Sequence, residues 1–530
     1  MAVAEATAPV ETGSHGDEGT TASTGGLAGL LGSGDHVTVG RLFLVTSVLF
    51  LLVTVVAAVL EQLEAVDLSD ALFTGQTAPA FASMHVTAGA FLFAIPAFLG
   101  LAIAVVPLQV GASTVAFPRA ATAAFWGWFF SGVVLLASYA VQFGPAGIDP
   151  TKFNGRLLWL VGLGGVLVSL SLATICVLTT LWALRTAGMG LDRVPYFSWS
   201  MLVAGSVWLV TLPVLLGLTV LGYISVRYQG GIAGDPSLER IALAWGTPGA
   251  FAWSVPLLGV LLDSAGTAVR ARFKMHDVLL GVVAVYTVFT FPAGFAIAFG
   301  QGGQSPVFQD FLYVVGSWFG AVVLLAFLGG LADGLRRAGK PKVSAPLVLG
   351  VFALLALLLG EGLNAARVVD NIDLTGTTAD IGVAHLAWVA GLLGVLAALH
   401  HWSTKVFGFV LKDGLGYLAG LAVLGGGVVT GAAHFAAALE ISSIDADTRE
   451  ALNGTVALIG WGLLALGVLV FLVNLAGSAA ASRSGDAAPD DPWDGLTLEW
   501  ATASPPVPGG PGPLEPVSSH TPLLDSKETV

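Results

Sequence analysis

Long apolar runs, separated by short polar segments, recur along the chain from about residue 40 to residue 477. Each run reaches the length of about 20 apolar residues that a helix needs to cross the hydrocarbon core of a bilayer. Within the runs the apolar residues follow one another without the alternation that the strands of a membrane barrel require. The pattern therefore predicts an all-α membrane protein with a twelve-helix bundle. The predicted spans are 39–61, 82–107, 120–145, 155–185, 196–226, 241–263, 275–300, 311–335, 343–363, 380–403, 413–439 and 452–477.

The composition of the chain supports a lipid environment. Hydrophobic residues make up 55% of the chain and charged residues only 10%, whereas a domain surrounded by water needs a more charged surface. We therefore expect the lipid bilayer as a partner. We expect no nucleic-acid partner, because the formal net charge is −13. Cys176 is the only cysteine and lies in an apolar run, which excludes a disulfide framework and a thiolate metal cluster.

The distribution of basic residues predicts the orientation of the chain. With the N-terminus in the cytoplasm, 15 of the 21 Lys and Arg residues fall on the cytoplasmic side, in keeping with the positive-inside rule. We therefore expect a multi-pass protein of the plasma membrane with both termini in the cytoplasm. Residues 1–35 are rich in Gly, Ala, Thr and Ser and predict a disordered leader. Residues 36–478 are the predicted membrane domain, and the Pro- and Gly-rich residues 479–530 predict an extended tail.

Five short segments, spread over most of the chain, are similar in sequence to one known family. They are Asp35-His36 before Gly40-Arg41, Met84-His85 followed by FLFAIPAFLG, VPLQVGASTVAFPR from Val106 to Arg119, LRTAGMGLDRVPYFSWSMLVAG from Leu184 to Gly205, and DPWDGLTLEWATASPP from Asp491 to Pro506. In this order they resemble subunit I of the haem–copper oxidases, the catalytic chain of cytochrome c oxidase. The resemblance implies the twelve-helix fold of that subunit, a place in respiratory electron transport, and partners similar to subunits II and III.

The resemblance also implies a low-spin haem held by two histidines, and His85 stands where the family has the first of them. Where the family has two histidines separated by one residue, this chain has only His385, within residues 383–388. One alignment, on the Ala-His word, puts His385 at the ligand of the family's second, high-spin haem. The other alignment, counted back from Trp402, puts His385 opposite His85. His85 and His385 are therefore the candidate haem ligands, and one low-spin haem or none are both left open.

The copper ion of the family has three histidine ligands, and the resemblance finds none of them in this chain. The first position is Thr247, within the word TPGAF of residues 247–251, where the family has His-Pro-Glu-Val-Tyr. The other two positions fall at Gly294 and Phe295. Because these residues lack the imidazole that binds copper, we expect no copper centre. The tyrosine of the family's word is replaced by Phe251.

The proton routes of the family are not expected either. Its acid after the second helix corresponds to Thr114, its glutamate on the sixth helix corresponds to Gly249, and its lysine on the eighth helix has no counterpart between residues 311 and 331. A proton path needs titratable or hydroxylic groups linked by water. On the first helix, a propionate-binding arginine of the family corresponds to Glu61, whose carboxylate would repel a haem propionate.

Polar side chains also gather near the end of the ninth predicted span, at Glu361, Asn364, Arg367 and Asp370. One interpretation is an ion pair or a contact with a partner subunit, because charged residues within a membrane are costly and are retained for a function. The other interpretation is a solvated helix end. The sequence leaves both open.

These observations favour a divergent relative of oxidase subunit I in a respiratory-type complex. In this hypothesis the chain has lost the copper centre and the proton channels, and acts as a non-catalytic or single-haem electron-transfer subunit. Two alternatives remain at this point. One is a working terminal oxidase, reducing oxygen to water with relocated ligands, and the other is a structural or assembly protein without a cofactor.

Overall fold

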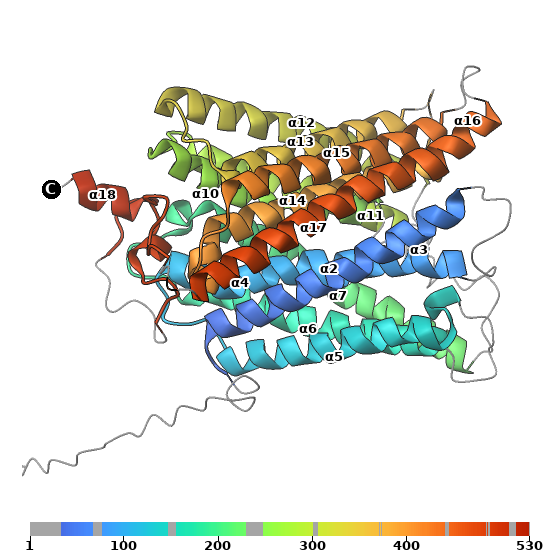
Figure 1. The fold of residues 1–530 in the computed structure, drawn as a ribbon, viewed down its shortest axis with the longest axis horizontal. Helices are drawn as coiled ribbons and strands as arrows, with labels where there is room; N and C mark the ends of the chain where they lie inside the picture. The colour runs from blue at the N-terminus through green and yellow to red at the C-terminus, as the bar shows by residue number, and fades with distance from the viewer. Residues whose placement is uncertain are drawn as a thin grey trace, which may run out of the picture.

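The computed structural model describes residues 33–66, 77–146, 155–228, 247–299, 306–369, 372, 374–439, 445–483, 485, 488–507 and 516–528. Within these ranges the regular structure is helical, and the long helices run side by side as one bundle (Figure 1). The end of the bundle beside α18 (Pro522–Glu528) is called the tail-side end, and the end where α3 (Thr77–Thr87) begins is called the far end.

Membrane-length helices make up most of the described chain. Among the described residues, eleven helices are long and apolar enough to cross a membrane, and a further apolar helix, His276–Thr290, is shorter. The predicted all-α membrane fold is thereby confirmed. The elements are α2 (His36–Ala65), the continuous run of α3, η1 (Ala88–Ala94) and α4 (Ile95–Val110), α5 (Pro118–Gln142), α6 (Gly155–Ala183), α7 (Tyr196–Tyr228), the pair α9 (Thr247–Ser254) and α10 (Pro256–Val269), α11 (His276–Phe299), α12 (Pro306–Ala338), α13 (Ala345–Arg367), α14 (Thr378–Phe407), α15 (Asp413–Ala437), and the run of α16 (Ala446–Ala451), η4 (Leu452–Val456) and α17 (Ala457–Arg483).

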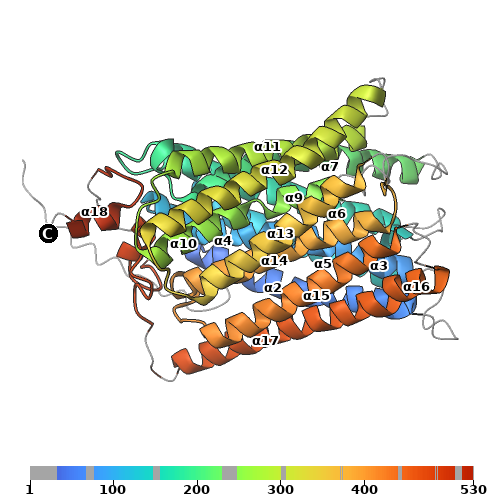
Figure 2. The same cartoon turned by 90° about the horizontal axis from the view of Figure 1, so that it is seen from above.

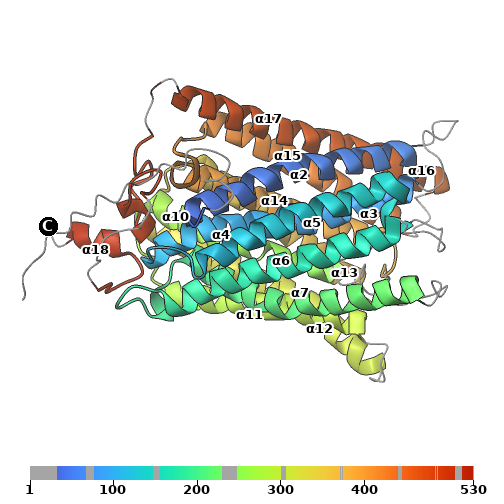
Figure 3. The ribbon, with the colours of Figure 1, turned by 90° about the horizontal axis from the view of Figure 1, so that it is seen from below.

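Helix α4 lies inside the bundle. All 16 of its residues are buried, because α2, α6, α7 and α14 pack against it. Figure 2 shows α15 and α17 at one edge of the bundle and α11 and α12 at the opposite edge, and Figure 3 shows α5 and α6 side by side on one face. Gly40 allows α2 to approach α4 closely, because a Cβ atom at this position would lie 2.5 Å from the carbonyl oxygen of Gly100.

The sixth span ends later than the sequence predicts. Helix α10 continues past residue 263 to Val269, and Arg270 ends it in the left-handed conformation with φ 52°. Asp263, the polar residue at the predicted end, is buried and accepts hydrogen bonds from the backbone N–H groups of Tyr196 at 3.1 Å and Phe197 at 3.0 Å. These two groups belong to the first turn of α7, whose N–H groups have no partner inside their own helix. The predicted start of the span, residues 241–246, lies outside the described residues.

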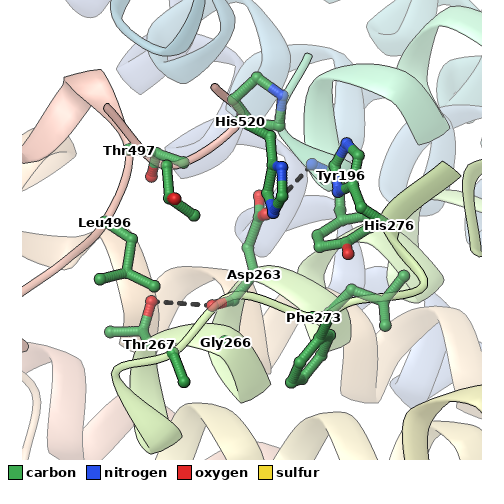
Figure 4. A pocket seen from close by; sticks show the side chains of 13 residues that line it. Tyr196, Asp263, Gly266, Thr267, Phe273, His276, Leu496, Thr497 and His520 are labelled. Carbon is green, nitrogen blue, oxygen red and sulfur yellow. Dashed lines mark hydrogen bonds between the residues drawn. The ribbon is translucent and has the colours of Figure 1, made fainter. Parts of the chain in front are cut away.

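The tail packs against the bundle and differs in this respect from the extended tail that its composition predicts. Helix α17 ends at Arg483, and the tail then forms η5 (Leu498–Ala501) and α18. Glu499 in η5 is fully buried. Further along, His520 stacks on His276 with ring centroids 3.9 Å apart, next to Tyr196 (Figure 4). The described tail is therefore part of the folded domain. The predicted leader, residues 1–35, lies almost wholly outside the described residues.

Candidate functional site

A cavity of about 260 Å³ lies between the far-end halves of several helices. Its walls come from α2, the run of α3 and η1, α9, α14, α15 and α17, and they combine small apolar residues with three indoles and three histidines. The ring-bearing residues of the wall are His85, His385, His434, Trp253, Trp388 and Trp461. Both histidines that the sequence predicts as haem ligands therefore border the same cavity.

His85 is held by a carboxylate from the neighbouring helix. Its Nδ1 lies 2.6 Å from Oε2 of Glu61, and both side chains line the cavity. Because Nδ1 is engaged, Nε2 is the ring nitrogen left for another partner. A carboxylate on the second nitrogen is the usual arrangement around a metal-binding histidine, since it fixes the tautomer and the ring orientation. Glu61, which corresponds to a propionate-binding arginine of the family, is paired with His85.

His385 enters the cavity from α14. It is largely buried, and its Nε2 has no hydrogen-bond partner among the described residues. The indole of Trp461 stands edge-on to it, with ring centroids 4.7 Å apart, and stands edge-on to His85 as well, at 5.7 Å. The two imidazoles therefore border one indole.

The helix that carries His85 has an irregular stretch, η1, directly after it. In a π-helical segment the hydrogen bonds reach one residue further than in an α-helix, which disturbs the regular pairing of backbone carbonyls. Here two indoles supply donors: Nε1 of Trp388 bonds to the carbonyl of Gly89 at 3.1 Å, and Nε1 of Trp128 bonds to the carbonyl of Phe91 at 3.0 Å. The first bond ties the His85 helix directly to α14, three residues after His385.

His434 is a third histidine of the cavity wall, and it is not among the candidate haem ligands of the sequence analysis. Its Nδ1 lies 3.0 Å from Oδ1 of Asn453, and it lines the cavity from α15. Its place near the far end of an apolar helix, like that of His85, was the signal available in the sequence. Among the described residues, no group of three or more His, Cys, Asp or Glu side chains is arranged to hold a metal ion, so the three histidines do not converge on one point.

At the positions that correspond to copper ligands, the structure describes the helices but not the side chains. Thr247 belongs to α9, and Gly294 and Phe295 belong to α11, but the side chains at these three positions lie outside the described part of the structure. Phe251 is described, and its phenyl ring is fully buried beside Gly360 of α13. A phenyl ring offers neither a proton nor a metal ligand.

The cavity residues fit a haem. Nε2 of His385 is buried without a partner among the described residues, Nδ1 of His85 faces the Glu61 carboxylate and leaves Nε2 as the nitrogen on the other side of the ring, and imidazole nitrogens are ligands of haem iron. The remaining wall is mostly apolar and aromatic, as in other sites for flat apolar cofactors.

Comparisons with known proteins agree on one family. The family described as cytochrome c and quinol oxidase polypeptide I matches residues 38–444. A putative cytochrome c oxidase subunit 1-beta of Streptomyces avermitilis is 26% identical over 521 residues, covering 93% of this chain and 90% of the relative. A heme-copper oxidase subunit I+III of Aeropyrum pernix is 28% identical over 499 residues, covering 89% of this chain and 60% of the relative. A solved heme-copper terminal oxidase dimer shares the fold, with a TM-score of 0.65 at 12% identity and 84% of each chain covered.

Proposed function

Because this chain belongs to the cytochrome c and quinol oxidase polypeptide I family, we propose that it is an oxidase-type subunit that transfers electrons through a single haem and does not reduce oxygen. The observation that carries this proposal is the pair of histidines on one cavity. His85 is oriented by Glu61, and Nε2 of His385 is buried without a partner among the described residues.

If haem binds here, the imidazoles of His85 and His385 would hold its iron, and the group would supply one-electron transfer without a position for oxygen. Other residues of the protein orient the His85 ring and line the site. The Glu61 carboxylate lies 2.6 Å from Nδ1 of His85, and a carboxylate on that side of the ring would make Nε2 a better donor to iron. Trp388 and Trp461 line the cavity with apolar indole rings, whose centroids lie 5.9 Å apart.

The proposed loss of the copper centre rests on residue types. Thr247, Gly294 and Phe295 offer no nitrogen or sulfur ligand to copper, and Phe251 stands where the family has a tyrosine. The proposed loss of proton channels rests in the same way on Thr114 and Gly249. Both replace acidic residues of the family.

The partner subunits and the membrane location of the chain are also part of this proposal. Partners resembling subunits II and III are supported by the family's multi-subunit complexes and by the A. pernix relative, whose name joins subunits I and III in one chain. A plasma-membrane location with cytoplasmic termini is supported by the asymmetry of Lys and Arg residues. The tail-side end of the bundle is then the cytoplasmic end.

The test is the optical spectrum of the purified full-length chain reduced with dithionite, together with haem and metal analysis of the same sample. We expect one low-spin haem per chain and no copper. The His85→Ala variant loses the haem. The His434→Ala variant, which removes another histidine of the same cavity wall, retains it, because the proposed ligands are His85 and His385.

Two results would contradict the proposal. Two haems together with copper in each chain would show a working oxidase with relocated ligands. A colourless protein, purified from cells that supply haem to other oxidases, would show a subunit without a cofactor.

A further inference from the structure

A chain of hydrogen-bonded side chains crosses three helices at the far end of the bundle, outside the proposed haem ligands. The hydroxyl of Tyr286 on α11 donates to Oε1 of Glu361 on α13 at 2.8 Å. Nδ2 of Asn364 donates to Oε2 of Glu361 at 3.3 Å, and Nε of Arg367 donates to Oδ1 of Asn364 at 3.0 Å. The guanidinium of Arg367 also pairs with Asp380 on α14. These five residues are called the Glu361 cluster.

The cluster is buried at one end and reaches water at the other. Tyr286 is 0% exposed and Glu361 is 2% exposed, whereas the side chain of Asp380 is 30% exposed. Arg367 is the last residue of α13, and Glu361 lies six residues earlier, which corresponds to a depth of about 9 Å at 1.5 Å per residue. The structure therefore resolves the two interpretations left by the sequence in favour of an ion-pair cluster. Asp370, the fourth residue of that prediction, lies outside the described residues.

Glu361 itself is bonded to neutral donors. Its described hydrogen-bond partners are Tyr286 and Asn364, and no described cation lies within ion-pair distance of its carboxyl group. The neighbouring helix α12 meets it with Gly320, where a Cβ atom would lie 2.9 Å from Oε1. The guanidinium of Arg367 pairs with Asp380, and its hydrogen-bonded connection to Glu361 runs through the amide of Asn364. Burial of a carboxylate without a paired cation is costly, and binding a proton removes that cost.

The cluster can accommodate the proton that this argument requires. A hydroxyl group both donates and accepts, so the 2.8 Å contact between Tyr286 and Glu361 is kept whether the carboxyl group is ionised or protonated. The amide of Asn364 bonds to the other oxygen in either state. Proton binding therefore changes the charge of the cluster and leaves its contacts in place.

The cluster also shares a wall with the proposed haem site. Asp380, which pairs with Arg367, lines the same cavity as His85 and His385. An electron added to the proposed haem brings negative charge next to Asp380. In a low-dielectric interior this charge acts on all the hydrogen-bonded residues of the Glu361 cluster. Reduction at the cavity then favours proton binding on Glu361, and proton binding on Glu361 favours reduction to the same extent.

We propose that Glu361 binds one exchangeable proton and that this proton is taken up when an electron enters the cavity between His85 and His385 and is released when the electron leaves. The second half of this inference rests on the proposed haem. The electron comes from the one-electron donor that reduces the haem. The proton comes from water and forms an O–H bond on the Glu361 carboxyl group, so charge is balanced in both directions.

Infrared spectroscopy of the full-length protein tests the proton site without reference to haem. We expect a carbonyl stretching band of a protonated carboxylic acid that shifts in D₂O, diminishes as the pH is raised and is missing from Glu361→Gln, a variant of nearly the same shape. The control is Asp333→Asn, which removes a carboxylate paired with Arg336 and Arg337 on α12 and leaves the band in place. An identical band in Glu361→Gln overturns the proton site.

The pH dependence of the haem midpoint potential tests the linkage. For one proton per electron, a tenfold change in proton concentration corresponds to about 59 mV, so the potential of the wild-type protein should fall by up to that amount per pH unit. The potential of Glu361→Gln should not change with pH. A wild-type potential that is independent of pH overturns the linkage. A colourless protein that still shows the Glu361 band contradicts the proposed function and supports the proton site.

Discussion

Gln109 of α4 and Glu499 of the tail are joined by a hydrogen bond across 390 positions of sequence, with Nε2 of Gln109 lying 3.0 Å from Oε1 of Glu499. The second N–H of the same amide bonds to Oδ2 of Asp263, also at 3.0 Å. The amide oxygen accepts the hydroxyl of Ser198 at 2.7 Å. One buried amide therefore links the tail, α4, α7 and α10.

Replacement of Gln109 should destabilise the tail-side end of the bundle. Gln109→Leu removes one hydrogen bond from each of two buried carboxyl groups, those of Asp263 and Glu499, and the loss of a hydrogen bond to such a group costs about 1.5–3 kcal/mol. The measurement is the free energy of unfolding in detergent, together with the rate of proteolysis within the tail. Ser198→Ala removes only one bond to the same amide and should cost about 1 kcal/mol. Equal losses in the two variants would disprove the bridging role of Gln109.

Docking of the tail should weaken as the pH falls. Burial lowers the pKa of His520 below its ordinary value of 6.5, and Arg272 contributes in the same direction. The docked state therefore favours the neutral ring, so its stability is complete above pH 6.5 and declines as the pH falls from 6.5 toward the lower pKa of the docked ring. Hydrogen exchange of residues 516–528 measures this decline.

The His520→Phe variant isolates the titration of His520. Phenylalanine keeps a flat ring against His276, which His520 meets at an interplanar angle of 11°, and it removes the titrating group. Exchange of the tail amides in this variant should have a weaker dependence on pH between 6.5 and 5. An unchanged dependence would assign the effect to another group.

Removal of the carboxylate behind His85 should weaken haem binding. Loss of a partner on the second nitrogen of a ligating histidine typically reduces affinity by about 10–100-fold, so Glu61→Ala should release haem to an acceptor such as apomyoglobin faster by about that factor. Glu64→Ala is the control, because Glu64 lies on the same helix and is not part of the cavity wall. Equal release from both variants would exclude a specific role of Glu61.

The crossing of α2 and α4 should not tolerate a side chain. Gly40→Ala places a methyl group 2.5 Å from the carbonyl oxygen of Gly100, and such overpacking costs about 1–3 kcal/mol. Gly217→Ala is a matched control within α7, since a Cβ atom there meets nothing within 4 Å. Thermal unfolding in detergent should separate the two variants, and a Gly40→Ala protein as stable as the control would contradict the close packing.

The membrane helices could be predicted from the sequence because apolar length alone determines a transmembrane helix. Their ends were less predictable. Helix α10 continues through Asp263 to Val269. The Asp263 carboxyl group is buried there because it accepts hydrogen bonds from the first turn of α7 and from Gln109. A local pattern carries no information about partners that are so distant in sequence.

The site could be predicted in part. The resemblance identified His85 and His385, and the structure brings both to one cavity. The pairing of Glu61 with His85 could not be predicted, because it depends on how α2 packs against α3. The place of His434 in the cavity wall could not be predicted either, because it depends on the position of α15. The burial of Glu499 could not be predicted from the Pro- and Gly-rich composition of the tail, because composition is an average over many residues and does not identify a single buried one.

The bond between Gln109 and Glu499 sets an order of events during synthesis. When α4, α7 and α10 have entered the membrane, Gln109 and Asp263 are in place, but Glu499 has not yet left the ribosome. The tail-side end of the bundle therefore lacks one of its hydrogen-bonding groups for as long as the tail is unmade. A chain that ends before the tail would leave Gln109 with Asp263 and Ser198 as partners but without Glu499.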